Sequence, residues 1–171
     1  MAVREVLTYP DVRLKKHAQP YKTIGVEAER LAADLFETMD AYDGVGLAAP
    51  QVGVSRRMFV LREPEGGLER CFVNPELLEC EGAEFAEEGC LSVPQVYAPV
   101  SRYTKLRVRA FDQYGEPFEL CAEGLLARII QHENDHLEGL VFLDRLDVLT
   151  HEAKLQEWKQ VSEQMATAGR T

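Results

Sequence analysis

Two histidines, His132 and His136, are spaced so that an α-helix would place both of them on one face. Residues four apart in a helix lie about one turn from each other, so both imidazoles can reach a single divalent ion. Glu133 follows His132 directly and is offset by roughly 100° around the helix, which leaves its carboxylate beside such an ion as a proton carrier. The spacing therefore predicts a helix here and favours metal-assisted hydrolysis.

A catalytic divalent site commonly has three protein ligands and one open position for water, so a third ligand is needed. In the extended motif HExxHxxGxxH a third histidine would complete the site. This class is excluded, because the position of that histidine is occupied here by Phe142. Cys90 follows a strand-like run, AEFAEEGCLS, and a thiolate with two imidazoles suits zinc or ferrous iron. Two alternatives stay open: a metallopeptidase that uses Glu157 as its carboxylate ligand, and a non-catalytic site closed by Cys80 or Cys71.

Periodic apolar residues predict three helices. The first runs from Val26 to Tyr42 and the second from Glu123 to Leu137, where a wide apolar face indicates a central position in the core. A last helix is expected from Val148 to Met165, with Asp147 as its N-cap. The segment GVGLAAPQ follows the first helix, and taken alone it indicates a helix stop and a loop.

Between the first two helices the pattern changes to short apolar stretches punctuated by Gly and Pro, which is typical of antiparallel strands. These strands are expected from about Arg57 to Leu120, with a hairpin turn at Tyr114-Gly115. The fold predicted is α+β, with antiparallel β-sheets packed around a central metal-binding helix and with an N-terminal and a C-terminal helix. We expect one catalytic domain over 1–171, in which 148–171 form a C-terminal helix and tail.

The net charge of −10 disfavours stable binding to nucleic acid or to anionic lipid. No apolar run approaches the roughly 20 residues that span a bilayer, and the first residues do not have the pattern of an export signal. We therefore predict a cytoplasmic protein with no membrane partner. In that setting Cys71, Cys80 and Cys121 are expected to be thiols that pack as small buried hydrophobes.

Three segments, GVGLAAPQ, EGCLS and QHENDH, in this order and with these separations, resemble the motifs of peptide deformylases. These enzymes remove the formyl group from the initiator methionine of new polypeptides and release formate. The opening VLTYPDVRLKKHA and the run LLARIIQHE extend the resemblance over roughly residues 6 to 147. The first segment then gains a meaning beyond a loop, because its glycines let backbone approach a ligand and its glutamine can donate a hydrogen bond to an oxyanion.

The resemblance implies a role for each residue of the site. It implies that Cys90, His132 and His136 bind the metal, that Gln51 and the backbone N–H of Leu91 stabilise the oxyanion, and that Glu133 is the general acid and base. The ion it suggests is ferrous iron, with zinc, nickel or cobalt as alternatives. It further suggests N-formyl-methionyl peptides as substrates, with transient ribosome association as a second kind of partner.

The methionine side chain needs an apolar pocket, and we expect Val45, Leu125 and Ile129 along it, unless these residues only pack in the core. The rest of the peptide is expected to lie along the backbone near Gly89 or along the segment that contains Gly44 and Gly46.

Two residues between the paired histidines, Asn134 and Asp135, are predicted to have roles other than metal binding. Asn134 departs from the apolar residue usual in the family, and we expect an altered packing contact with intact chemistry. Asp135 either orients a ligand histidine or forms an ordinary salt bridge.

Overall fold

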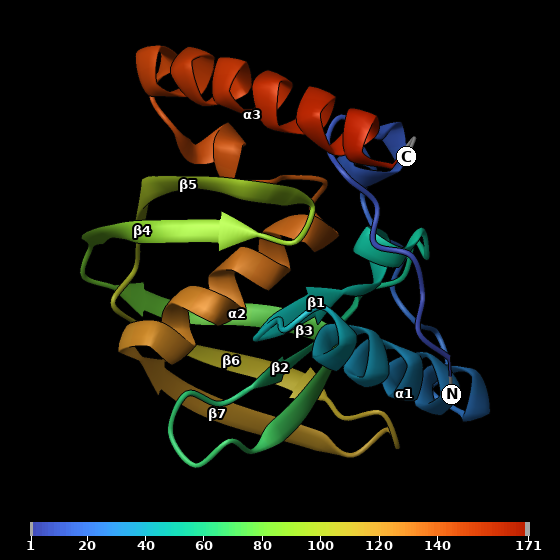
Figure 1. Cartoon of the computed structure of the whole chain (residues 1–171). Coiled ribbons are helices and arrows are strands. Elements are labelled where there is room, and N and C mark those ends of the chain that lie inside the picture. Colours follow the sequence, from blue (N-terminus) through green and yellow to red (C-terminus); the bar gives the residue numbers. More distant parts are fainter. Residues whose placement is uncertain (1, 170–171) are drawn as a thin grey trace.

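The structure is a computed structural model, and it describes residues 2–169. Helix α2 lies in the middle of the molecule, with a two-stranded sheet on one side and a five-stranded sheet on the other (Figure 1). Its helices are α1 (Val26–Ala41), α2 (Gly124–Leu137) and α3 (Val148–Ala168), with short 3₁₀ helices η1 (Val12–Lys15), η2 (Ala49–Val52) and η3 (Phe142–Arg145). Its strands are β1 (Gly46–Ala48), β2 (Met58–Arg62), β3 (Glu69–Glu81), β4 (Glu84–Cys90), β5 (Val93–Arg102), β6 (Lys105–Phe111) and β7 (Pro117–Glu123).

Both sheets are antiparallel. The larger has the strand order β1-β2-β3-β6-β7, and the smaller consists of β4 and β5 alone. The predicted hairpin turn connects β6 to β7, where the N–H of Gly115 donates to the carbonyl of Asp112. The α+β architecture with a central helix is therefore confirmed.

Helix α2 is held between the sheets because its two faces differ in polarity. On one face Ala127, Ile130 and Leu137 are fully buried against the five-stranded sheet, whose Phe59 and Phe72 rings stack at 4.7 Å between centroids. The opposite face turns its polar residues toward β4 and β5. The helix ends where predicted, and Gly139 just beyond it has a φ of +77°, the left-handed conformation that glycine adopts most easily after a helix.

Helix α1 covers β1 and β2 (Figure 1). Its buried stripe contains the predicted Leu31, Leu35 and Met39, at the expected helical spacing. These side chains pack with the inner face of β2 to form a second part of the core.

Helix α3 lies across β5 and η3. Asp147 caps it as predicted, because its carboxylate accepts a hydrogen bond from the N–H of Thr150. The helix continues past Met165 to Ala168, three residues beyond the expected end. Trp158 fixes it to the rest of the molecule, since the ring is buried and its Nε1–H donates to the carbonyl oxygen of Tyr9 at 3.0 Å.

Two sequence-based expectations were wrong. The segment that begins at Gly44 is not only a loop, because Gly46–Ala48 pair with β2 as the edge strand β1 and η2 follows directly. Three residues are too short a strand for an alternating pattern to be visible. Cys121 is exposed rather than buried, because along β7 it alternates with the buried Ala122 and points to the solvent face of the sheet. Cys80 is only half-buried, and Cys71 is buried as expected.

Within residues 2–169, every helix is too short or too polar to cross a lipid bilayer.

Replacement of Trp158 by Ala tests how firmly α3 belongs to the folded unit. We expect the free energy of unfolding to fall by about 3–5 kcal/mol, because a large buried ring and its hydrogen bond are lost together. Urea denaturation followed by circular dichroism measures this change. Leu149→Ala is the matched control on the same helix, since Leu149 is 79% exposed, and it should change stability by no more than about 0.5 kcal/mol.

The same unfolding curves test the expectation of a single domain over 1–171. One cooperative transition that moves as a whole in Trp158→Ala agrees with it. A separate early transition for α3, with the rest of the curve unchanged, would contradict it.

Candidate metal centre and active site

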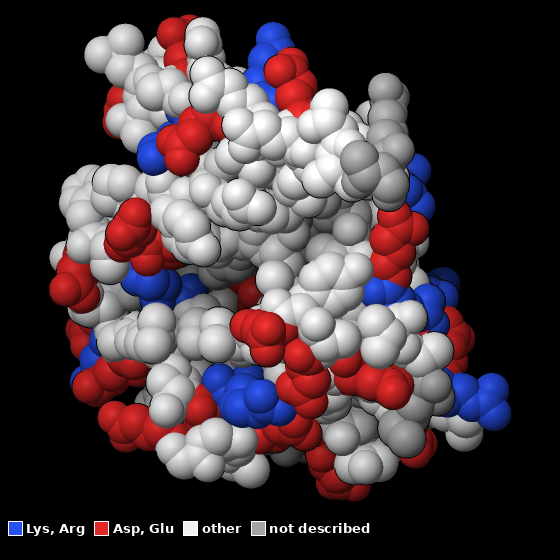
Figure 2. Space-filling model, viewed as in Figure 1, with Lys and Arg blue, Asp and Glu red and all other residues white. Residues whose placement is uncertain are grey.

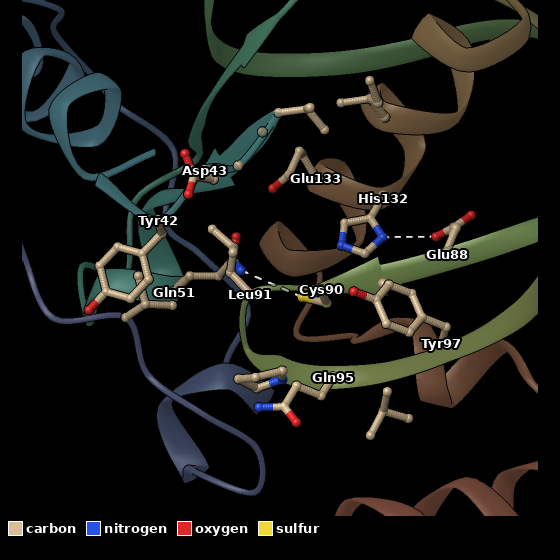
Figure 3. Close-up of a pocket in the computed structure, with 18 of the residues that line it drawn as sticks. Tyr42, Asp43, Gln51, Glu88, Cys90, Leu91, Gln95, Tyr97, His132 and Glu133 are labelled. Atoms are coloured by element: carbon tan, nitrogen blue, oxygen red, sulfur yellow. Dashed lines mark hydrogen bonds and ion pairs between the residues drawn. The ribbon is translucent and has the colours of Figure 1, made fainter. Parts of the chain in front are cut away.

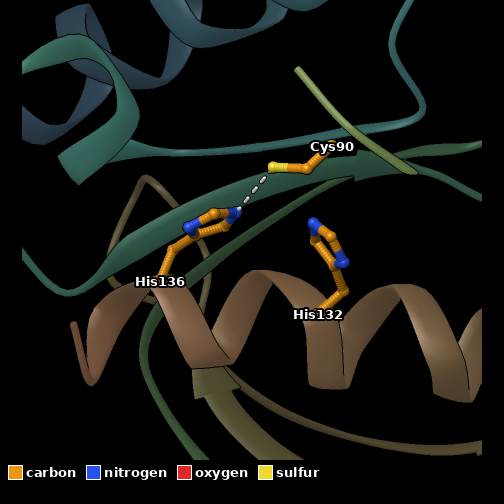
Figure 4. A group of neighbouring side chains, drawn as sticks. All are labelled: Cys90, His132 and His136. Carbon is orange, nitrogen blue, oxygen red and sulfur yellow. Dashed lines mark hydrogen bonds between the residues drawn. The ribbon is translucent and has the colours of Figure 1, made fainter. Parts of the chain in front are cut away.

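Three side chains that can bind a metal converge between β4 and α2. Cys90 is the last residue of β4, and His132 and His136 are one turn apart on α2, so the strand end delivers the thiol to the helix face (Figure 4). One ligand atom from each residue lies within 4.8 Å of the others. The Sγ of Cys90 is 3.4 Å from the Nε2 of His136. The arrangement brings a sulfur and two imidazole nitrogens to one point.

The alternative ligands lie elsewhere. Among residues 2–169, no other Cys, His, Asp or Glu belongs to this group. Glu157 is on α3 and forms an ion pair with Lys154 at 3.0 Å. Cys71 packs in the core with α1, and Cys80 lies far along β3. The structure thus places Cys90, and not the other candidates, beside the two histidines, and it leaves one side of the group open.

Glu88 fixes the orientation of His132. Its Oε1 is 2.8 Å from the Nδ1 of His132, so the other ring nitrogen faces the cysteine (Figure 3). The same buried carboxylate accepts hydrogen bonds from Arg102 at 2.9 and 3.0 Å and from Arg128 at 2.6 Å. Although burial alone would raise the pKa of Glu88, the bonds to His132 and Arg102 outweigh it and lower that pKa to about 2.

Asp135 extends this ion network away from the site. It accepts a hydrogen bond from Arg102 at 2.6 Å and two from Arg145 at 3.0 and 2.7 Å. Asp135 therefore forms salt bridges and acts on His132 only through Arg102 and Glu88. Of the two expectations for this residue, the salt bridge is the one the structure shows.

Glu133 is almost completely buried and lines a cavity. The side chain is buried, and its Oε2 has no hydrogen-bond partner among the described residues. Burial disfavours the charged form and raises the pKa of Glu133 to about 7. A side chain at Gly46 would force Glu133 to move, because a Cβ there would lie 2.7 Å from Oε1 of Glu133 and 3.0 Å from its Cδ and Cγ. The absence of a side chain at Gly46 thus leaves space for the carboxylate of Glu133.

The two histidines differ in their surroundings. Burial lowers the pKa of His136 well below its usual value, and its Nδ1 has no partner in the described part of the chain. Burial also opposes protonation of His132, but Cys90 and Glu88 outweigh it and raise the pKa of that ring. Both rings are held with one nitrogen toward the sulfur, which is the geometry that a shared cation requires.

Gln51 is buried beside Cys90. Its Oε1 accepts from the N–H of Ala48 at 2.9 Å, and its Nε2 is 3.1 Å from the Oγ of Ser92 and 3.6 Å from the Sγ of Cys90. The bond to Ala48 fixes which end of the amide points at the site. Leu91 follows Cys90 directly, so its backbone N–H also lies next to the three converging side chains.

A cavity of about 680 Å³ opens beside these residues. Every residue that we expected to contact substrate lines it. Ile129 is buried in its wall, whereas Val45 and Leu125 are exposed at its mouth. The expected backbone segments line the same space, with Gly44 and Gly46 on one side and Gly89 on the other.

Asn134 faces away from this cavity. It lines a second, smaller cavity of about 370 Å³ on the far side of α2, together with Leu77, Tyr103 and Arg145. Its Oδ1 is buried without a partner among the described residues. The altered packing contact expected for Asn134 is therefore outside the metal centre.

Sequence reasoning missed the residues that support the site. Glu88 was overlooked although it stands only two residues before Cys90; a register shift of β4 between these two residues interrupts the alternation that would otherwise put them on one face. Arg102 and Arg128 had no comparable signal, because each is isolated in an apolar strand or helix. Tyr97, which lines the cavity from β5, was also missed.

Comparison with known proteins gives a consistent result. The family model for polypeptide deformylase matches residues 3–152. A peptide deformylase from Legionella pneumophila has 42% identity and a TM-score of 0.85, with 95% of this chain and 98% of that chain covered. One from Thermus thermophilus has 39% identity and a TM-score of 0.87, with 92% of this chain and 94% of that chain covered.

A third structure, a peptide deformylase from Ehrlichia chaffeensis in complex with actinonin, has 36% identity and a TM-score of 0.88, with 94% and 98% of the two chains covered. The matched region contains all three converging segments as well as both sheets. From this match, and from the site it encloses, the chain belongs to the polypeptide deformylase family and is an enzyme of that family.

Proposed function

We propose that this deformylase hydrolyses the formamide of N-formyl-methionyl peptides, with Cys90, His132 and His136 holding one divalent metal ion. The observation that carries the proposal is the position of the three ligand atoms, within 4.8 Å of one another at the bottom of an open cavity and beside a buried carboxylate. A thiol with two imidazoles fits zinc or ferrous iron. We take ferrous iron as the first choice, with zinc, nickel or cobalt able to bind.

The side chains fit such an ion in two respects. Glu88 already holds the far nitrogen of His132, as a partner of a ligating histidine does in many metal sites. The described residues supply three ligands and no fourth, which leaves a position for water or substrate. When bound, the ion supplies Lewis acidity and lowers the pKa of a coordinated water toward about 7.

Glu133 is the group we assign to proton transfer. It takes a proton from the attacking water as the new bond to the formyl carbon forms, and it passes that proton to the amide nitrogen as the C–N bond breaks. The products are formate and a free methionine amine. Support comes from the position of Glu133, which is buried next to His132 and whose Oε2 has no hydrogen-bond partner among the described residues.

Hydrogen-bond donors are needed to stabilise the negative charge that develops on the formyl oxygen. We assign the side-chain amide of Gln51 and the backbone N–H of Leu91 to this role. The contact between Ala48 and Gln51 supports the first assignment, because it keeps the donor end of the amide toward Cys90. Donors held in place before the reaction stabilise the transition state without having to reorient.

The cavity also fits a peptide substrate. We propose that the unbranched methionine side chain enters among Val45, Leu125 and Ile129. The chain beyond methionine then lies between the backbone of Gly44 and Gly46 on one side and Gly89 on the other, as an added strand. Backbone hydrogen bonds of that kind tolerate varied sequence. A cytoplasmic location and transient association with ribosomes complete the proposal.

Formate release tests the activity directly. Enzyme loaded with ferrous iron without oxygen should release one formate for each formyl-methionyl peptide consumed. The acetylated peptide should yield less than about one hundredth as much acetate, because the added methyl group must fit where only hydrogen stood. Enzyme with one equivalent of bound metal that releases no formate would contradict the proposal.

Replacement of Glu133 by Gln tests its role. We expect kcat to fall at least about a hundredfold, because the amide cannot carry the proton. Metal content, measured by atomic emission, should remain one ion per chain, since Glu133 is not a ligand in this account. Glu152→Gln on the exposed face of α3 is the matched control and should keep parental kcat. Activity of Glu133→Gln within a few-fold of the parent would remove Glu133 from this role.

A further inference from the structure

The second cavity, of about 370 Å³, lies on the side of α2 that is turned away from the metal centre. Asn134 and Asp135 of the helix form one wall, and Arg102 and Tyr103 at the end of β5 form the other. Arg145 of η3 also lines it. The deformylation proposed above uses no group that faces this space.

The ion network beside this cavity has more positive than negative groups. Asp135 is shared by Arg102 and Arg145, and Arg102 continues to Glu88, which also binds Arg128. Three guanidinium groups are thus joined to two carboxylates, which leaves one positive charge in excess within this set. A buried network of this kind is stabilised by a further anion if one can reach it.

Arg145 is the member of the network that a dissolved ligand can reach. Its side chain is 46% exposed, whereas that of Arg102 is 3% exposed. Its Nε and Nη2 bind Asp135, and its Nη1 makes no hydrogen bond within residues 2–169. Glu138 lines the same cavity but does not cancel this charge, because it is already bonded to Arg57 at 2.7 Å.

Asn134 supplies an acceptor to the same cavity. Its Oδ1 is buried and has no hydrogen-bond partner among the described residues. Gln131, one turn earlier on α2, shows the contrast, because its amide is satisfied by the backbone of Tyr103 and of Ala127. A buried acceptor that has lost water without gaining a partner is destabilising, so a ligand that donates a hydrogen bond to it is favoured.

We propose that this cavity binds a small oxyanion that retains a proton, with hydrogen phosphate as the representative ligand. The oxygens of the anion accept hydrogen bonds from the guanidinium of Arg145, and its O–H donates to Oδ1 of Asn134. The half-exposed Tyr103 can add its own O–H as a donor. Sulfate offers the same charge and shape but has no O–H at neutral pH, so it leaves the asparagine oxygen unpaired.

The large cavity is a poorer place for such an anion. Glu5, Asp43 and Glu87 line it with exposed carboxylates, and its one arginine among the described residues, Arg128, is already bonded to Glu88. Figure 2 shows a largely uncharged area across the middle of this face, between β5 and β1, with acidic groups near its border. The carboxylates repel anions from this mouth, whereas the second cavity attracts them.

Thermal unfolding of the zinc-loaded protein in phosphate and in sulfate tests the site, because a ligand that binds only the folded state raises Tm. Sulfate at matched ionic strength is the reference, since both anions also stabilise proteins in general through exclusion from the surface. We expect about 20 mM phosphate to raise Tm by roughly 3 °C more than sulfate does.

Two variants locate the ligand. Asn134→Leu removes the acceptor with a side chain of similar size, and Arg145→Met removes the exposed guanidinium. In each variant the difference between phosphate and sulfate should fall below about 0.5 °C. Arg109→Gln is the matched control and should keep the parental difference, because Arg109 is likewise a half-exposed arginine bonded to a carboxylate, that of Glu76 at 2.7 Å, but lies on β6.

Each other outcome would overturn the inference. Equal shifts in phosphate and sulfate would show that no proton on the anion is needed and that Asn134 is not its acceptor. A phosphate-specific shift that persists in Asn134→Leu or in Arg145→Met would place the anion elsewhere, with the metal ion as the obvious alternative. No shift in either anion would leave the cavity without this ligand. None of these results would bear on formate release, so the proposed function is tested separately.

Discussion

The carboxylate of Glu88 is the point on which the site depends. It lies on β4, two residues before Cys90, and it binds His132 and Arg128 of α2 as well as Arg102 of β5. The small sheet and the central helix are thus joined by ion pairs whose side chains are almost completely buried. Loss of the carboxylate would leave two buried guanidinium groups without this partner, a change that typically costs about 3–5 kcal/mol. The network therefore ties the helix that carries both histidines to the strand that ends in Cys90.

A third segment, formed by β1 and η2, also contributes side chains and space to the site. Strand β1 brings Gly46 against Glu133, and the turn η2 that follows holds Gln51 beside Cys90. The helix supplies two nitrogens and a carboxylate, the strand end supplies sulfur, and the glycine-containing segment supplies room and a donor. Each segment alone has an ordinary structural explanation, and the chemistry arises only from their meeting. Because the site is divided among three segments, a short histidine motif by itself says little about the reaction.

Much of this arrangement could be predicted from the sequence where the signal is local. Helix α2 was predicted by its apolar period, and Asp147 by its position before α3. Partners far apart in sequence have no such signal. The bonds of Glu88 to Arg102 and Arg128 depend on sheet pairing and on how α2 crosses β4, and no spacing predicts those. The strand β1 was missed because three residues show no period, and the exposure of Cys121 was missed because it depends on which face of β7 the folded sheet turns to solvent.

The most direct test of the account is X-ray absorption spectroscopy of zinc-loaded protein, which counts the atoms bound to the metal. We predict one sulfur at about 2.3 Å, two nitrogens at about 2.0–2.1 Å and one exchangeable oxygen. The sulfur shell should vanish in Cys90→Ser and persist in Cys121→Ser, which removes the exposed thiol of β7. A spectrum without sulfur, or one with a second sulfur in place of the oxygen, would contradict a catalytic centre built from Cys90, His132 and His136.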